Sequence, residues 1–432
     1  METNTHTKNM LMKKKPKKIL PLVLIAALFP LFFACNTDSE DVKHEIQDDA
    51  KPIELRMMEK VETDNDFALE LLKASYKFDN KDNIFISPLS VSMALSMTLN
   101  GARGETLEEM QEALRAKGYS VEDINEYNKS LKKALVEVDK STELTIANSI
   151  WYRNDITVYD DFINVNKDNY DAEIKTLDFS SPDALKQING WCAKQTKDKI
   201  PEIIKEIPGN ALMYLINAIY FKGIWTSRFE KKDTNKEDFY TEDKVSTGKV
   251  DMMHQTEAFD FFADEYCRYL RMAYGNKAFS MVVMLPNDDK TVDEVISNLD
   301  SERWNDAMKY MSGRDINLSF PRFKAECDYE MQKDILPDMG MIIPFSEYYA
   351  DFKNMCIPAP YINRVIHKTF IEVNEEGTEA AAVTAVEMIK LAGMPSEPII
   401  IEYKVNKPFV FAIRENSTGI ILFIGKMGKI EK

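Results

Sequence analysis

Seven short runs rich in Val, Ile, Phe and Tyr occupy the later part of the 432-residue chain, each bounded by residues that favour turns. Such side chains fit the pleated, half-buried surface of a sheet, so we expect each run to form a strand. A fold with this many strands needs other elements to cover the apolar sheet faces. The runs are residues 211–221, 279–285, 316–323, 368–374, 398–405, 409–413 and 419–424.

Helical patterns dominate the first part of the chain. Residues 66–72 place their large apolar side chains on one helical face. Ser87 and Pro88 supply an N-cap and a first-turn proline for a helix that runs to Asn100. The run that begins at Thr106 has the form of a capping box and predicts a further helix start. Together with the strand runs, these patterns predict a mixed α+β fold.

The structured patterns continue without a linker, and no internal repeat is visible, so we expect one large domain over residues 55–432. Residues 35–54 are polar and acidic. They have too few apolar side chains to fold alone, so we expect an acidic flexible tether there.

The N-terminus has the pattern of an export signal. Five lysines among residues 13–18 precede an apolar stretch, residues 19–33, which is shorter than the roughly 20 residues needed to span a bilayer. The following cysteine, Cys35, resembles a bacterial lipoprotein processing site. We therefore expect residues 1–34 to be a signal peptide, and Cys35 to be lipidated and to anchor an exported protein on the periplasmic or cell surface. Phe32 and Phe33 are unusual before such a cysteine, and plain secretion or an uncleaved anchor is the alternative.

The net charge is −16, and without residues 1–34 the chain has 49 basic and 70 acidic residues and a net charge of −21. A body this acidic argues against nucleic acid or an anionic membrane surface as partner. The remaining cysteines contain no C-x-x-C pair, so we expect buried free thiols and neither a metal site nor a disulfide framework. They are Cys192, Cys267, Cys327 and Cys356.

Enzymatic chemistry has little support in the sequence. Of four histidines, His6 and His44 fall in the leader and the tether, which leaves His254 and His367. The chain has no G-x-S-x-G, H-E-x-x-H, P-loop or G-x-G-x-x-G motif. A Ser-His-Asp triad assembled from distant positions would leave no such motif. We expect neither an enzyme nor a cofactor.

Two structures compete for residues 376–391. By propensity, Thr378 would cap an alanine-rich helix that runs to Lys390. As a strand, the same segment would place both of its charges, Glu379 and Glu387, on one face and small uncharged side chains on the other. Periodicity alone does not choose between the two.

The segment Val373-Asn374-Glu375-Glu376-Gly377-Thr378-Glu379-Ala380-Ala381-Ala382 resembles the hinge signature of inhibitory serpins almost letter for letter. Further matches to serpin motifs occur in order across about residues 55–432. They lie at residues 83–90, 101–106, 216–225, 250–253, 280–286, 320–324, 351–352, 367–368, 406–409 and 422–426.

The resemblance implies a serpin fold of three β-sheets and eight or nine helices, with an exposed reactive loop at about residues 375–398. It implies a suicide substrate: a serine protease, or a cysteine protease, attacks the loop, and the cleaved loop inserts into the main sheet and traps the acyl-enzyme. It also implies a monomer. The hinge residues are then Glu375, Glu376, Gly377, Thr378, Glu379, Ala380, Ala381 and Ala382.

Family spacing from Gly377 places the scissile bond between Leu391 and Ala392. The stretch that follows is slightly longer than in typical relatives, so Lys390 and Met394 remain rival bait residues. Leucine would suit a chymotrypsin- or elastase-like protease, and lysine a trypsin-like one.

The family match also assigns a polar cluster beneath the strands that open (Ser87, Ser90, Asn217 and His367) and an entry point for insertion (Trp225 and Arg322, with Arg322 paired to Glu375). Each residue also has a purely structural interpretation, as a helix cap, a core side chain or a surface charge. The alternative function is a serpin-fold binding or chaperone-like module without inhibition. Small side chains at Ala380, Ala381 and Ala382 favour the inhibitor.

Overall fold

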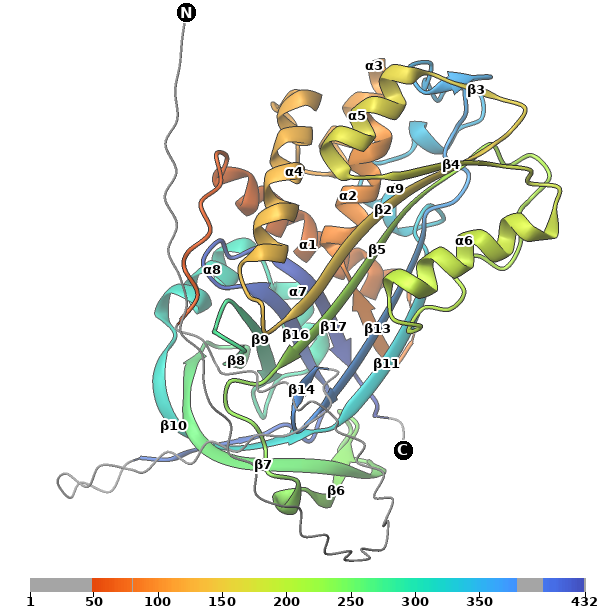
Figure 1. Ribbon diagram of the computed structural model, residues 1–432. Helices are drawn as coiled ribbons and strands as arrows, with labels where there is room; N and C mark the ends of the chain where they lie inside the picture. The colour runs from red at the N-terminus through yellow and green to blue at the C-terminus, as the bar shows by residue number, and fades with distance from the viewer. Residues whose placement is uncertain (1–48, 80, 379–398, 431–432) are drawn as a thin grey trace, which may run out of the picture. The chain divides into compact units, whose positions relative to one another are not determined.

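The computed structural model describes residues 49–79, 81–378 and 399–430, all of which belong to one compact unit (Figure 1). The predicted strand runs are confirmed in it. One run is divided, because residues 316–323 cover the end of one strand and the start of the next, with Arg322 between them. Three sheets, of nine, six and two strands, are formed by the described residues, as the family resemblance implied.

The nine-stranded sheet has the order β1-β17-β16-β9-β8-β7-β10-β15, with β6 also paired to β7. Most of its pairs are antiparallel, but the edge strand β15 runs parallel to β10. Its strands are β1 (Asn83–Ile86), β6 (Asn235–Tyr240), β7 (Ser246–Ala263), β8 (Cys267–Tyr274), β9 (Phe279–Pro286), β10 (Ser312–Pro321), β15 (Ile401–Lys404), β16 (Phe409–Glu415) and β17 (Ile421–Met427).

The six-stranded sheet has the order β11-β13-β14-β5-β2-β4. A two-residue strand, β14, therefore separates two long strands, β13 and β5. The strands are β2 (Glu143–Arg153), β4 (Glu173–Leu177), β5 (Met213–Ile224), β11 (Phe323–Glu330), β13 (Ile366–Asn374) and β14 (Gly377–Thr378), and the small third sheet pairs β3 (Thr157–Val158) with β12 (Cys356–Ile357).

The described residues form nine α-helices and two short 3-10 helices, within the expected range. None of these helices is long and apolar enough to cross a bilayer. They are α1 (Glu59–Phe78), α2 (Pro88–Leu99), α3 (Gly104–Ala113), α4 (Val121–Glu137), α5 (Asp160–Tyr170), α6 (Pro182–Gln195), α7 (Val292–Asn298), α8 (Ser301–Tyr310), α9 (Ile335–Asp338), η1 (Lys231–Asp233) and η2 (Ile343–Phe345).

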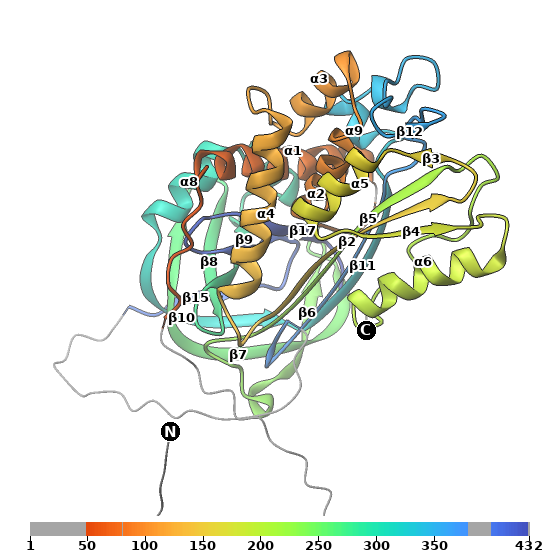
Figure 2. The ribbon, with the colours of Figure 1, turned by 45° about the horizontal axis from the view of Figure 1, so that its top comes forward.

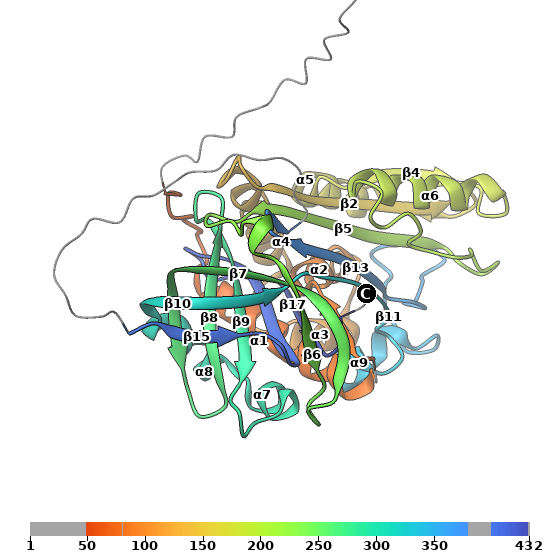
Figure 3. The ribbon, with the colours of Figure 1, turned by 90° about the horizontal axis from the view of Figure 1, so that it is seen from below.

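The six-stranded sheet lies between two apolar cores because its strands alternate side chains between the faces. On β5, Ile216 and Ala218 join the core beneath α6, with Trp191 of that helix. Ile219 and Phe221 join the larger core on the opposite face, which α1 and α2 help to form. Figures 2 and 3 show α6 over β2 and β5, with α1 and α2 on the other side of the sheet. This double packing fixes β5 as one border of the site.

Two details add to the sequence interpretation: one predicted helix start is shifted, and the end of one expected segment has partners in the body. The helix predicted to begin at Thr106 begins at Gly104, and the Thr106 hydroxyl instead accepts a hydrogen bond from the amide of Asp351. The end of the predicted tether also contacts the body, since the amides of Ala50 and Ile53 donate to the Asn276 carbonyl and the Ser417 hydroxyl. The Thr106 hydroxyl, which the capping-box pattern assigned to a helix end, therefore stabilises a contact between two segments that are remote in sequence.

The four described cysteines are free and buried, as expected. Burial raises the pKa of Cys192 to about 12 and that of Cys356 to about 11. These thiols are protonated at neutral pH, so they are core side chains and not nucleophiles.

Candidate functional site

The first residues of the predicted hinge lie in the middle of the six-stranded sheet. Gly377 pairs with Asn374 on one side and Ile224 on the other, and Thr378 pairs with Val373 and Gly223. Among the described residues, β13 and β5 are joined through β14 alone. Of the two structures considered for this segment, its first described residues adopt the strand.

Gly377 is required by the backbone at this point. Its φ of +151° lies in a region that residues with a side chain rarely adopt. A Cβ atom there would lie 2.0 Å from the Gly223 carbonyl oxygen and 2.7 Å from the Ile224 Cα. The chain can turn into the sheet here only because the hinge has glycine at this position.

An ion pair fixes the start of the hinge. The Glu375 carboxylate is almost completely buried and accepts hydrogen bonds from the Arg322 Nε at 2.8 and 2.7 Å and from the Thr234 hydroxyl at 2.6 Å. Burial alone would raise the pKa of Glu375, but the bonds from Arg322 and Thr234 outweigh it and hold this pKa below its usual range. The carboxylate is therefore charged and paired where the chain enters the sheet.

Trp225 holds the backbone of the same turn. Its indole Nε1 donates to the Asn374 carbonyl at 3.0 Å, and its amide donates to the Glu376 carbonyl at 2.8 Å. The ring stacks on Tyr274 with centroids 4.4 Å apart and is 1% exposed. The Glu376 carboxylate pairs with Lys231 at 2.8 Å. Trp225 thus links β5, β8 and the hinge.

The residues of the predicted polar cluster are only partly brought together by direct bonds. The Ser87 amide donates to the Nε2 of His367 at 2.9 Å, the Ser87 hydroxyl donates to the Leu422 carbonyl at 2.7 Å, and this hydroxyl also accepts from the Ser90 amide at 3.2 Å. Burial lowers the pKa of His367 to about 3, so the ring is neutral.

Asn217 binds a residue that the sequence analysis did not single out. Its side-chain nitrogen donates to the Oδ1 of Asn148 at 2.7 Å, and no direct bond to Ser87, Ser90 or His367 is found among the described residues. Asn148 faces Asn217 across the β2–β5 ladder and in turn donates to the Tyr170 carbonyl at 2.8 Å. The cluster therefore has a second arm that runs from β5 to α5.

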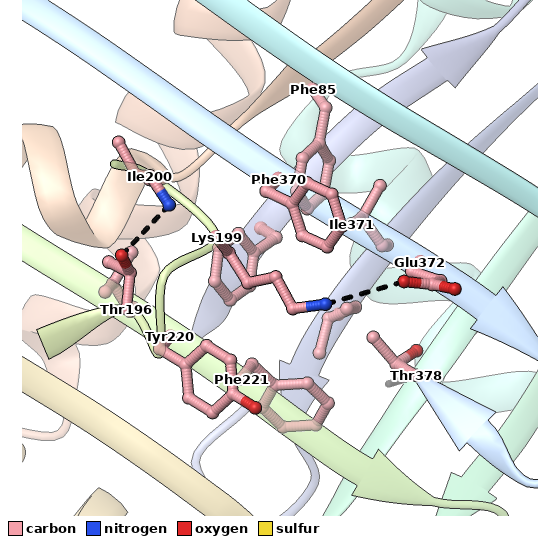
Figure 4. Close-up of a pocket in the computed structure, with 13 residues that line it drawn as sticks. Phe85, Thr196, Lys199, Ile200, Tyr220, Phe221, Phe370, Ile371, Glu372 and Thr378 are labelled. Carbon is pink, nitrogen blue, oxygen red and sulfur yellow. Dashed lines mark hydrogen bonds and ion pairs between the residues drawn. The ribbon is translucent and has the colours of Figure 1, made fainter. Parts of the chain in front are cut away.

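Next to Thr378, residues of β5 and β13 border a small cavity of about 20 Å³, and the space between these two strands is called the gap (Figure 4). Phe221 of β5 and Phe370 of β13 contribute to its lining, and Lys199, from the segment after α6, reaches across to Glu372 at 3.6 Å. The walls are mostly aromatic and aliphatic. A strand with small side chains is the kind of chain that such a narrow gap accepts.

Several predicted site residues lie outside the described residues. These are the rest of the hinge, the bait and its rivals, and the lipidation site: Glu379, Ala380, Ala381, Ala382, Lys390, Leu391, Ala392, Met394 and Cys35. The first described residues beyond the loop are Ile399 and Ile400, and Ile399 is 88% exposed.

Residues 62–430 match the family model described as serpin (serine protease inhibitor). The chain belongs to the serpin family. Serpins are not enzymes, in agreement with the prediction from motifs.

Curated relatives and solved structures extend the match. The leukocyte elastase inhibitor of Xenopus laevis is 35% identical over 372 residues, which cover 83% of this chain and 96% of the relative. A crystal structure of the thermophilic serpin tengpin in its native state is 35% identical, with a TM-score of 0.78, and covers 88% of this chain and 96% of tengpin. Thyroxine-binding globulin in complex with thyroxine is 28% identical, with a TM-score of 0.76, and covers 87% of this chain and all of that structure.

Sequence reasoning missed four side chains that contact the predicted serpin residues. For Asn148 the signal is its pairing across the two strands with Asn217, the asparagine of the 216–225 motif. The others carry no signal in the sequence, because they come from the 3-10 turn after β5 and from the end of β8, and only the fold brings them to the hinge. They are Lys231, Thr234 and Tyr274.

Proposed function

We propose that this serpin inhibits serine proteases as a suicide substrate. The observation that carries the proposal is the position of Gly377 and Thr378 between β13 and β5. Thr378 is the last described residue before the loop, and it lies at one end of a gap whose borders, β5 and β13, share no other strand within the described part of the sheet.

The register of β14 suggests how far an inserted strand would extend. Continued without a shift, residues 378–388 would pair with residues 223–213 and so cover the whole of β5. Since Thr378 faces the buried Tyr274, alternation would place Ala380, Ala382 and Thr384 on the same inner side. The two glutamates of the segment would face outward. The predicted bait, Leu391, would lie just beyond the end of β5.

The chemistry then follows from this geometry. The protease serine attacks the Leu391 carbonyl, the bond to Ala392 breaks, and the new amino group leaves with the C-terminal part of the chain. Insertion of residues 379–388 carries the ester-linked protease about 34 Å along the sheet. Hydrolysis of the ester needs close alignment of nucleophile, base and oxyanion hole, so strain on the acyl group stops the second step.

The experiment is a protease panel. The chain without residues 1–34 is incubated with chymotrypsin, elastase and trypsin, and denaturing gels are searched for a covalent complex. A complex with chymotrypsin or elastase and a released fragment that begins at Ala392 are expected. A fragment that begins at Leu391 would identify Lys390 as the bait, and one that begins at Pro395 would identify Met394. Cleavage by all three proteases without any complex would refute inhibition.

A second candidate is a binding or chaperone-like module without inhibition. The similarity to thyroxine-binding globulin, a serpin-fold structure solved with thyroxine, supports it. The small hinge side chains at residues 380–382 favour the inhibitor instead. Heat stability distinguishes the two, because a cleaved loop that becomes a strand should raise the melting temperature well above that of the intact chain, whereas a loop that stays outside should not.

Export and membrane anchoring through Cys35 complete the proposal. The support is the lysine-rich, apolar leader followed by a small residue and cysteine. A lipidated chain should partition into the detergent phase of Triton X-114 extracts of the producing bacterium and should incorporate labelled palmitate, and Cys35→Ser should abolish both. Release of an unlabelled body into the medium would favour plain secretion.

A further inference from the structure

A second, larger cavity lies at the far end of the gap between β5 and β13, away from the hinge. Its volume is about 550 Å³, within the usual range for small-molecule sites. One wall is a single face of α2, since its residues Ser90, Val91, Ala94, Leu95 and Thr98 follow helical spacing. The rise of a helix makes this wall about 12 Å long.

The lining of the cavity consists mostly of residues with apolar side chains, together with several polar groups. Besides the α2 face, it includes Ile203, Ile216, Phe352, Met355, Ile362 and Val365. The charged groups at its edge are engaged or face solvent: Arg364 pairs with Glu330, Lys368 pairs with Asp328 at 3.4 Å, and Glu347 is exposed. The cavity therefore combines apolar side chains with uncharged polar groups, and its charged side chains are paired or exposed.

One end of the cavity is polar. The side-chain Oδ1 of Asn217 is buried there and has no hydrogen-bond partner among the described residues. His367, 5% exposed, also lines this end. Because its Nε2 accepts from the Ser87 amide, the neutral ring carries its proton on Nδ1, for which the described residues supply no acceptor. An acceptor on β5 and a donor on β13 thus both lack a hydrogen-bond partner among the described residues.

We propose that this cavity binds an uncharged amphiphile with an unbranched apolar body and a single hydroxyl or carbonyl head. The body would lie along α2, and the head would satisfy Asn217 and His367. A hydroxyl suits the pair because it donates to the amide oxygen and accepts from the ring N–H.

A carboxylate is the wrong head for this site. Burial lowers the pKa of His367 to about 3, so at neutral pH the polar end contains no cation that would offset the desolvation of an anion. The unpartnered Asn217 oxygen would in addition repel it. The cavity should therefore distinguish a fatty alcohol from the fatty acid of the same length.

Calorimetric titration of the chain without residues 1–34 with 1-decanol tests the proposal, with decanoate as the matched anion. One decanol per chain is expected, and affinity for decanoate at pH 7.5 should be at least about tenfold weaker, since one unpaired buried charge costs more than 1.4 kcal/mol. Equal affinity for both, or no saturable binding of decanol, would overturn it.

Two matched pairs of variants locate the ligand. Ala94→Phe should fill the cavity and abolish binding, whereas Ala134→Phe, at a half-buried alanine of α4, should not. Asn217→Leu should weaken the affinity for decanol about tenfold because it removes the hydrogen-bond acceptor. Asn363→Leu, at the exposed rim of the cavity, should leave this affinity unchanged. Circular dichroism checks that each variant is folded. If either Ala94→Phe or Asn217→Leu leaves the affinity for decanol unchanged, decanol does not bind in this cavity. No protease enters these measurements, so they stand whether or not the chain inhibits.

Discussion

The hydroxyl of Thr378 lies 2.6 Å from the hydroxyl of Tyr274, inside the six-stranded sheet and 3% exposed. Burial raises the pKa of Tyr274, so its hydroxyl stays neutral and the pair is an uncharged hydrogen bond. A charged side chain at residue 378 would have to be desolvated against this ring, at a cost of several kcal/mol.

A Thr378→Arg variant should therefore still be cleaved by the protease but should no longer inhibit it. We expect the yield of covalent complex to fall at least about tenfold, while the rate of loop cleavage stays within twofold or rises. Thr378→Ser, which keeps the hydroxyl, should inhibit nearly as the parent chain does. Densitometry of complex and cleaved bands measures the partition. Undiminished complex formation by the arginine variant would refute insertion at this point.

Removal of Arg322 should loosen the hinge. Its partner Glu375 is 2% exposed, whereas Arg322 is 39% exposed, so we expect Arg322→Ala to cost about 2 kcal/mol, below the range for a fully buried pair. The amides of Trp225 and Phe229 donate to the carbonyls of Glu376 and Glu375, and their hydrogen exchange should accelerate. Arg314→Ala, at an exposed arginine of β10, is the control and should leave these amides protected.

Gly377→Ala should destabilise the same turn for a different reason. The φ of +151° and the 2.0 Å approach of a Cβ to the Gly223 carbonyl should together cost at least about 3 kcal/mol or expel β14 from the sheet. Gly313→Ala has open space around it and should change stability by less than about 0.5 kcal/mol. Thermal melting compares the two, and equal melting temperatures would show that β14 does not adopt this geometry in solution.

Acid should destabilise the chain through His367. Its pKa in the folded state, about 3, lies below the value of about 6.5 in an unfolded chain. Between these values the unfolded chain binds a proton that the folded chain does not, so this contribution is complete above about pH 6.5 and is lost as the pH falls toward 3. At pH 5 the loss should reach about 2 kcal/mol. When the pH is lowered, the melting temperature, measured at one scan rate, should fall less for the His367→Gln variant than for the parent chain or for the His254→Gln variant.

The strands and the family could be read from the sequence, but the ends of elements could not. Residues 316–323 have the pattern of a single strand, yet the chain leaves the nine-stranded sheet after Pro321 and enters the six-stranded sheet at Phe323. Arg322, between the two strands, pairs with Glu375. Thr106 and the residues after it fit the pattern of a capping box, but the Thr106 hydroxyl accepts a hydrogen bond from the amide of Asp351, which is remote in sequence. Local propensity cannot include such tertiary partners.

The same limit applies to the site. The hinge glycine and the Arg322–Glu375 pairing were expected from the resemblance, and the structure brings these residues together. Thr234 and Tyr274 were not expected, since an isolated threonine and tyrosine look like any others until β8 and the 3-10 turn fold against the hinge. Propensity favoured a helix beginning at Thr378, where backbone pairing with two neighbours outweighs it.

The two ends of the loop are held in different sheets, Thr378 in the six-stranded sheet and Ile401 at the edge of the nine-stranded one. If pairing ran to residue 388 without cleavage, only about twelve residues, at most about 40 Å of extended chain, would remain to return along roughly 33 Å of strand to β15. The intact loop would then be stretched almost taut. Under the proposed mechanism, the length of the intact loop would oppose complete insertion, and a single cut near Leu391 would remove this restraint.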